Sequence, residues 1–243
     1  MKTIGLIGGM SWESTTLYYQ IINRAVAERL GGLNSARIVL ASVNFAEIAA
    51  MQRAGQWAEM AGLLADNARK LEHAGADCIL IGTNTMHKVA PQVQSAIGVP
   101  LLHIADAAAS AIRAQGLRKV GLLGTRFTME QPFYAEHLAQ FGIEAITPDE
   151  ALRNEVHRII FEELCQGKML DYSRHVLLRI ADILAEQGAE GLILGCTELP
   201  LLLQQNHTTF PLFDTTALHA LAAVDFALQE TRTNQATAEL QEA

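Results

Sequence analysis

The sequence predicts an α/β fold of two pseudo-symmetric, Rossmann-like domains, each a parallel sheet flanked by helices. One observation is that short apolar segments bounded by Gly, Pro or Asn alternate with segments of helical periodicity, which is typical of parallel strands joined by crossover helices. The other is an internal repeat. Residues 71–83 (LEHAGADCILIGT) align without a gap with residues 184–196 (LAEQGAEGLILGC).

Two more segment pairs extend this repeat in the same order. Residues 4–9 (IGLIGG) resemble 120–125 (VGLLGT), and 99–102 (VPLL) resemble 210–213 (FPLF). The nearly constant offset indicates an ancient duplication, with the active site in the cleft between the halves. We expect a first half of 1–103 plus 215–230 and a second half of 104–214. Residues 231–243 are polar and lack apolar periodicity, so we expect this tail to fray.

The element boundaries follow from the same patterns. The strands are expected at the continuous apolar runs, residues 3–7, 38–43, 78–81, 101–104, 120–123, 191–194 and 211–213. The helices are expected where apolar residues recur with helical spacing, at 14–30, 45–53, 57–74, 105–115, 128–141, 154–166, 172–187 and 215–229.

The composition excludes several classes of protein. The net charge is −8 and half of the residues are apolar, and no basic stripe is present, so a nucleic-acid partner is not expected. No apolar segment is long enough to span a membrane, and the N-terminus predicts a first strand and not a signal peptide. Three cysteines without C-x-x-C spacing fit neither a disulfide framework nor a zinc site, so we expect a cytoplasmic protein with no metal.

The repeat places Thr83 opposite Cys196. Both residues follow a buried strand, where open α/β sheets carry their ligand chemistry, so they suggest an acid and a base on opposite sides of a substrate. Thr128 with Gln131 also forms a T-x-x-Q pattern, which predicts a capping box. Other residues after strand ends can donate hydrogen bonds to a ligand: Asn84, Thr85, Thr125, Thr128 and Thr197.

Two motifs carry a family resemblance. ILIGTNTMHK (79–88) resembles the first signature of the aspartate/glutamate racemase family, and LILGCTELPLL (192–202) resembles the second. The opening IGLIGGMSWEST is similar to the aspartate racemase branch, which includes broad-specificity amino-acid racemases. The resemblance covers the chain up to the tail. Members usually carry a cysteine immediately before the asparagine or one residue earlier, where this chain has Thr83 and Gly82.

The resemblance implies an isomerase that racemises amino acids without pyridoxal phosphate or any other cofactor. One thiolate removes the α-proton and the opposite thiol donates a proton to the other face. Here the pair would be Cys196 and Thr83. A helix N-terminus after Thr197 is expected to lower the pKa of Cys196. An alcohol donates a proton more readily than it removes one from carbon, so we expect the two enantiomers to react at different rates.

The resemblance also bears on substrate and assembly. It implies a small amino-acid substrate, either aspartate and glutamate or a broader set, with Met10 as an apolar wall and Gln52 at the side-chain end. Acid-racemising relatives use a lysine in a K-x-G turn, and Cys165 stands at the comparable place. A homodimer is implied. Tyr18 and Tyr19 are candidate interface residues, and the same residues could equally belong to the core.

Two other functions are left open by the sequence. Arylmalonate decarboxylases of this superfamily also have glycine and threonine at the first position and keep only the second cysteine, so a single-cysteine decarboxylase is an alternative. The other alternative is a catalytically weakened paralogue that binds an amino acid.

Overall fold

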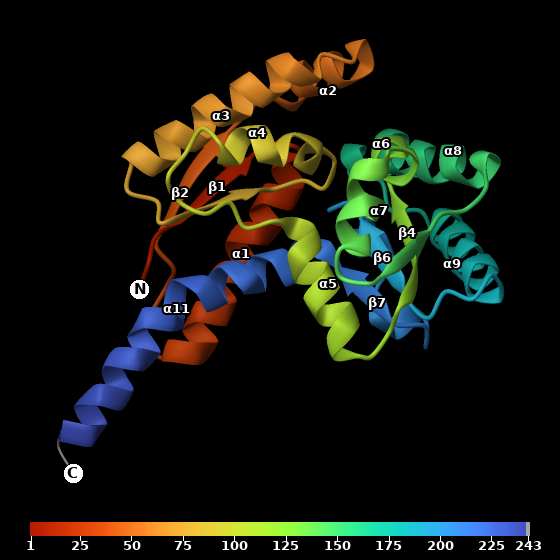
Figure 1. Cartoon of the computed structure of the whole chain (residues 1–243). Helices are drawn as coiled ribbons and strands as arrows, with labels where there is room; N and C mark the ends of the chain where they lie inside the picture. Colours follow the sequence, from red (N-terminus) through yellow and green to blue (C-terminus); the bar gives the residue numbers. More distant parts are fainter. Residues whose placement is uncertain (242–243) are drawn as a thin grey trace. The chain divides into compact units, whose positions relative to one another are not determined.

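A computed structural model describes residues 1–241, with side chains described up to residue 229. The chain divides into two compact units. Unit 1 comprises Met1–Gly82, Val89–Leu102 and the chain from His219 onward, and unit 2 comprises Thr83–Lys88 and His103–Leu218. Each unit contains a parallel sheet flanked by helices, which confirms the predicted fold class (Figure 1).

Unit 1 is built on a three-stranded parallel sheet of order β2-β1-β3. The strands are β1 (Ile4–Gly8), β2 (Ile38–Ser42) and β3 (Cys78–Ile81). One face is covered by α1 (Trp12–Leu30) and by α11 (Thr215–Gln241) from His219 onward, and α3 (Trp57–His73) lies over the other face (Figure 1). Beside α3 lie α2 (Phe45–Ala54) and α4 (Ala90–Gln94).

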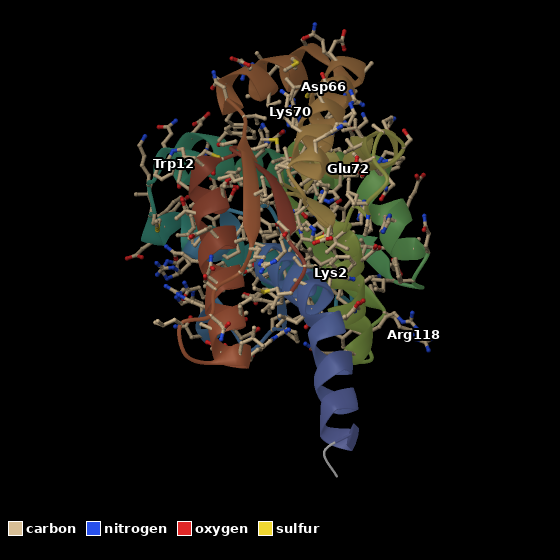
Figure 2. All side chains as sticks on the ribbon, turned by 90° about the vertical axis from the view of Figure 1, so that its left-hand side faces the viewer. Lys2, Trp12, Asp66, Lys70, Glu72 and Arg118 are labelled. Carbon is tan, nitrogen blue, oxygen red and sulfur yellow. The ribbon has the colours of Figure 1, made fainter. Side chains whose placement is uncertain are left out.

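The core of unit 1 includes a buried hydrogen-bonded pair. The Tyr18 hydroxyl lies 2.8 Å from Nδ1 of His219, and Nε2 of His219 donates to the Leu102 carbonyl at 2.8 Å. Tyr18 is fully buried, so of its two expected places, interface or core, it occupies the core. Tyr19 is 57% exposed, and Trp12 is 68% exposed and points outward from α1 (Figure 2).

Unit 2 is built on a four-stranded parallel sheet of order β5-β4-β6-β7. The strands are β4 (Lys119–Gly124), β5 (Glu144–Ile146), β6 (Leu192–Gly195) and β7 (Leu212–Asp214). One face packs against α5 (Ile104–Ala114) and α7 (Pro132–Ala139), and the other against α8 (Glu150–Arg158) and α9 (Asp171–Glu186). The side chains of successive β4 residues pack on opposite faces of the sheet, because side chains alternate along a strand.

The two sheets share one strand order. β1, β2 and β3 correspond to β4, β5 and β6, and an isolated parallel bridge from Ile79 to Leu101 occupies the place at which Leu212 of β7 pairs with Leu192 of β6. The matched sequence segments therefore occupy equivalent positions in the two units.

Several element boundaries differ from the expected ones. The strand expected at 101–104 is only the bridge at Leu101, because α5 already begins at Ile104. The helix expected at 128–141 is two helices, α6 (Arg126–Glu130) and α7, because Gln131 is extended before Pro132. The helix expected at 154–166 begins at Glu150 and changes after Arg158 into a π-helix, Ile159–Glu163, and a 3-10 turn, Leu164–Gln166.

The expected division of the chain also needs two corrections. Residues 83–88, assigned to the first half, belong to unit 2, because their side chains bond to residues of that unit. The tail expected to fray is helical up to Gln241, since neither glycine nor proline interrupts α11, and residues 242–243 lie outside the described part. Across the described residues, no helix combines the length and apolarity needed to cross a bilayer.

Candidate active site

Most of the predicted site residues belong to unit 2. They are Thr83, Asn84, Thr85, Thr125, Thr128, Cys196 and Thr197. Met10 and Gln52 belong to unit 1, where both are buried, Met10 in the turn after β1 and Gln52 near the end of α2. The structure thus brings both signature motifs, apart from their strand β3, into one compact unit.

Two glycines bring the ends of β4 and β6 close together. Gly124 pairs with Gly195 in the parallel register. A Cβ on Gly124 would lie 2.7 Å from the Gly195 carbonyl oxygen, and a Cβ on Gly195 would lie 2.8 Å from the Leu123 carbonyl oxygen. Any larger residue would force the strands apart. Thr125 and Cys196 follow these glycines directly, so the same close approach sets both of their turns.

A buried cluster of three hydroxyls forms beside the end of β4. Thr85 Oγ1 lies 2.9 Å from Thr125 Oγ1 and 3.4 Å from Thr128 Oγ1, and the latter two are 3.2 Å apart. Thr125 caps α6 by accepting from the Thr128 backbone N–H at 3.4 Å. The capping box predicted for Thr128 and Gln131 is therefore wrong, because the helix begins one turn earlier. The cluster gathers several polar hydrogens where a ligand carboxylate can accept them.

Asn84 joins the first signature to the second. Its amide Nδ2 donates to Thr215 Oγ1 at 3.0 Å, and the Thr215 hydroxyl donates to the Leu194 carbonyl at 2.8 Å. Leu194 lies two residues before Cys196. Asn84 Oδ1 is buried and has no hydrogen-bond partner among the described residues. An unpaired buried acceptor is costly, so this oxygen is suited to accept from a ligand such as an ammonium group.

His87 holds Thr83 and is not a base. Its Nδ1 bonds to the Thr83 carbonyl at 2.8 Å, and its Nε2 accepts from the Ile104 backbone N–H at 3.1 Å. These partners fix a neutral imidazole with the proton on Nδ1. Thr83 itself is partly exposed, and its hydroxyl makes no hydrogen bond to the described residues. The hydroxyl is therefore available to a ligand.

Cys196 is a buried thiol paired with a carboxylate. Its Sγ donates to Glu198 Oε2 at 3.0 Å, and the Thr197 hydroxyl donates to the same oxygen at 3.0 Å. Burial, and then the charge of Glu198, raise the pKa of the Cys196 thiol well above its ordinary value. The predicted lowering of this pKa is wrong. α10 (Leu199–Leu202) is a single turn with Glu198 at its N-cap, so a negative charge lies where helix donors were expected.

Cys165 lies close to the same site. It packs against the core cluster that contains Cys196, and its charge also raises the pKa of Cys196. The π-helix that precedes it is held by buried Glu163, which accepts from Arg158 Nη1 at 2.7 Å and from Ser173 Oγ at 2.5 Å. The place at which some relatives carry a substrate-binding lysine therefore holds a partly buried cysteine, which cannot supply a positive charge.

One group of side chains among the described residues has the composition of a metal site: His103, Asp106 and His137. His137 Nε2 lies 2.6 Å from Asp106 Oδ1, but the His103 and His137 rings are stacked 3.9 Å apart and 8° from parallel. Lone pairs of parallel stacked rings do not converge on one ion, so this arrangement does not match a metal site. Burial, with His87 and His137 nearby, lowers the pKa of His103 to about 2, so His103 is neutral.

Three residues of the site were missed by the sequence-based assignment. Glu198 lies two residues after Cys196, a spacing that allows a direct hydrogen bond. His87 and Thr215 were not among the predicted site residues either. The Asn84–Thr215 bond joins residues 131 positions apart, and nothing local in the sequence signals it.

Replacing Glu198 with glutamine should lower the pKa of the Cys196 thiol, because the charge disappears while an acceptor oxygen remains. The ultraviolet absorbance of the thiolate, followed against pH and corrected with Cys196→Ser, measures this change. Glu186→Gln removes an exposed carboxylate at the end of α9 and serves as the matched control. An unchanged or higher pKa in Glu198→Gln would contradict the assigned electrostatic role.

Comparisons with known proteins agree on one family. Residues 7–223 match the Asp/Glu/Hydantoin racemase family. The broad specificity amino-acid racemase RacX of Bacillus subtilis is 28% identical, over 68% of this chain and 71% of RacX. A Yersinia pestis structure ascribed to the Asp/Glu racemases is 54% identical, with 94% and 100% of the chains covered and a TM-score of 0.88. An aspartate racemase homologue from Pyrococcus horikoshii is 37% identical, with 93% and 99% covered and a TM-score of 0.82. The chain belongs to the Asp/Glu/hydantoin racemase family.

Proposed function

We propose that this protein is a cofactor-independent amino-acid racemase in which Cys196 and Thr83 exchange the α-proton. The observation that carries the proposal is the hydrogen bond from the buried Cys196 thiol to Glu198, directly after β6 in a chain of this family. The hydroxyl cluster and the unpaired Asn84 Oδ1, in the same unit, supply partners for a substrate carboxylate and ammonium.

Proton removal begins with the Cys196–Glu198 pair. The thiol proton moves to the Glu198 carboxylate, and the resulting thiolate takes the α-proton from the substrate, so no proton leaves the site. Negative charge then spreads from the α-carbon onto the substrate carboxylate. The hydroxyls of Thr85, Thr125 and Thr128 are positioned in advance to donate there, which stabilises the charge most at the moment it develops.

Thr83 completes the inversion by donating its hydroxyl proton to the opposite face of the carbanion. The alkoxide then regains a proton from water, which its partly exposed position permits. Glu198 returns its extra proton to the hydroxide left in the solvent, so every group ends the cycle in its starting state. The reverse step requires an alcohol to remove a proton from carbon, which is much harder. The two enantiomers therefore react at different rates, while the equilibrium between them is unaffected.

The substrates are aspartate and glutamate or a broader set of amino acids. RacX is named for broad specificity, and the Pyrococcus horikoshii protein is named as an aspartate racemase homologue. Cys165 in place of a lysine favours the broader set, since a cysteine offers no positive charge to compensate a second carboxylate. Met10 and Gln52 are proposed to contact the substrate side chain. Gln52 is only 7% exposed, which is unusual for a glutamine on a helix.

A homodimer is proposed for the assembly. Trp12 and Tyr19 are exposed on α1 of unit 1 and supply apolar surface of the kind that interfaces bury. Sedimentation equilibrium at micromolar concentration tests the proposal, and a mass of 26.4 kDa would contradict it.

A second candidate is a single-cysteine decarboxylase that protonates an enediolate. The observation that favours it is the raised pKa of Cys196, because a thiol that stays protonated is a ready donor. Release of carbon dioxide from a disubstituted malonate, without α-proton exchange in any amino acid, would select this candidate over the racemase.

Cys196→Ser should abolish α-proton exchange. With each enantiomer of aspartate, glutamate and several neutral amino acids in D2O, the native protein should exchange the α-proton with inversion, and the variant should be slower by about 100-fold or more. Proton NMR follows the loss of the α-proton signal, and chiral chromatography follows inversion. Cys78→Ala, which replaces a free thiol of β3 outside the proposed site, is the control and should remain active.

The outcome separates the candidates. No exchange of any amino acid by the native protein contradicts the racemase. Binding of amino acids without exchange would instead indicate a weakened binding paralogue. Equal exchange by the native protein and by Cys196→Ser would remove Cys196 from the reaction.

A second thiol at the first signature should increase turnover. Thr83→Cys supplies a group that can both remove and donate a proton, so the rate of inversion should rise by about tenfold or more, and the rates from the two enantiomers should become more similar. Gly82→Cys tests the neighbouring position. A Cβ there would lie 3.2 Å from the Ile7 carbonyl oxygen and 3.4 Å from Leu6 Cδ1, which requires only a small shift. A gain in Gly82→Cys alone would show that Thr83 is not the proton donor.

A further inference from the structure

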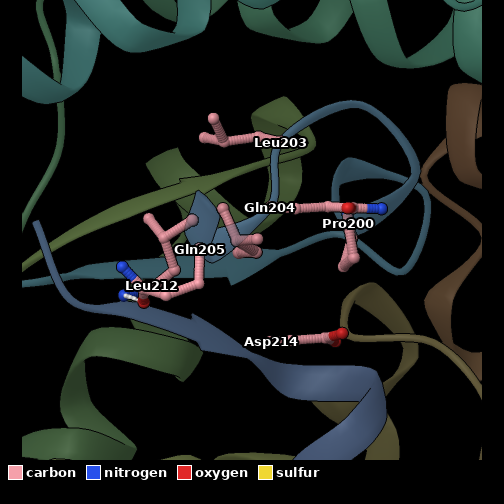
Figure 3. Close-up of a pocket in the computed structure, with 7 residues that line it drawn as sticks. Pro200, Leu203, Gln204, Gln205, Leu212 and Asp214 are labelled. Atoms are coloured by element: carbon pink, nitrogen blue, oxygen red, sulfur yellow. Dashed lines mark hydrogen bonds between the residues drawn. The ribbon is translucent and has the colours of Figure 1, made fainter. Parts of the chain in front are cut away.

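Unit 2 contains a cavity of about 330 Å³ that none of the proposed reaction or substrate residues lines (Figure 3). Its apolar walls come from Leu194, Pro200, Leu203 and Leu212. The volume is at the lower end of the range for small-molecule sites, which suits a ligand of a few heavy atoms. The volume and the lining of the cavity therefore suit a small ligand with an apolar part.

The charged group of the cavity is the Asp214 carboxylate at the end of β7 (Figure 3). Its Oδ1 accepts from the backbone N–H groups of Thr216 at 2.9 Å and Ala217 at 3.1 Å, which fixes the side chain at the start of α11. Oδ2 receives no hydrogen bond from the described residues, and no cation among them pairs with this carboxylate. Burial raises the pKa of Asp214, and the two backbone bonds counter that rise only in part.

One of the two amide side chains that line the cavity is already bonded to the protein. Gln205 Oε1 accepts from the Leu212 N–H at 2.9 Å, and its Nε2 donates to the carbonyls of Thr208 at 2.9 Å and Phe210 at 3.1 Å. Gln205 therefore forms a rigid part of the rim. A ligand that enters the cavity meets apolar walls, the Gln204 side chain and one Asp214 oxygen that accepts no hydrogen bond from the described residues.

We propose that this cavity binds an aliphatic primary ammonium group, with the ammonium on Asp214 Oδ2 and the carbon chain against Leu203 and Leu212. A cation compensates the half-buried carboxylate, and an anionic ligand would add a second uncompensated charge. The apolar walls favour a chain of several methylenes over ammonium itself. The site is independent of the proposed racemase reaction, because it shares no residue with it.

n-Butylammonium is the probe, titrated into the full-length protein and followed by methyl NMR of Leu194, Leu203 and Leu212. These methyl signals should shift saturably, each methylene from methyl- to n-butylammonium should tighten binding by up to about fourfold, and butanol and butyrate should bind at least tenfold more weakly. Nα-acetyl-lysine amide tests whether the ammonium can come from a protein side chain, because it presents the same group on a peptide unit.

Asp214→Asn is the decisive variant, because asparagine keeps the oxygen that caps α11 and removes only the charge. It should weaken n-butylammonium binding at least tenfold. Asp149→Asn makes the same change at the N-cap of α8 and should leave binding unchanged. The proposal is overturned if the leucine methyls do not shift, if butanol binds as well as n-butylammonium, or if Asp214→Asn binds as tightly as the native protein. All of these results come from binding measurements, so they do not depend on whether the protein racemises amino acids.

Discussion

The candidate site depends on how the segment after β3 is anchored. Leaving a strand exposes backbone and side-chain polar groups that must find partners. Here those partners come from unit 2: Thr215 for Asn84, the threonine pair of β4 and α6 for Thr85, and the Ile104 N–H for His87. Because His87 also bonds to the Thr83 carbonyl, the backbone of the proposed proton donor is fixed by the same set of contacts.

The state of Cys196 follows from its pairing with Glu198. A thiolate and a carboxylate whose atoms lie 3.0 Å apart in a buried site would repel strongly, so the pair retains one proton between them. Forming the thiolate then means moving that proton onto Glu198, not releasing it to solvent. Any reaction of the Cys196 thiol therefore depends on both groups. In a relative with a different residue at position 198, the free energy needed to form the thiolate would be different.

The sequence predicted the fold because duplication leaves a signal that propensity alone does not. The matched segments fixed the equivalence of β1 with β4 and of β3 with β6, and the family signatures identified Cys196 and its neighbours. β5 was missed because three residues, only partly buried, carry no alternation to detect. The contacts of Asn84 were missed because they join distant segments.

The predicted pKa of Cys196 failed for a different reason. The sequence shows that a helical turn follows, but a four-residue helix has little dipole, and the effect of burial outweighs it. The helical turn was predicted correctly, but its effect on the pKa is smaller than the effect of burial. The local pattern is enough to propose Cys196 as the reactive residue, but only the three-dimensional surroundings determine its protonation state.

The two halves of the repeat differ at two positions of the candidate site. Thr83 stands opposite Cys196, and Thr85 therefore stands opposite Glu198. The second half holds a thiol with a carboxylate that can take its proton, whereas the first holds an alcohol followed by a hydroxyl that is tied into the threonine cluster. The first position thus lacks both the acidic atom and the partner that would ionise it. The asymmetry of the site is consequently built into two residues on each side, and exchanging one residue restores only the acidic atom.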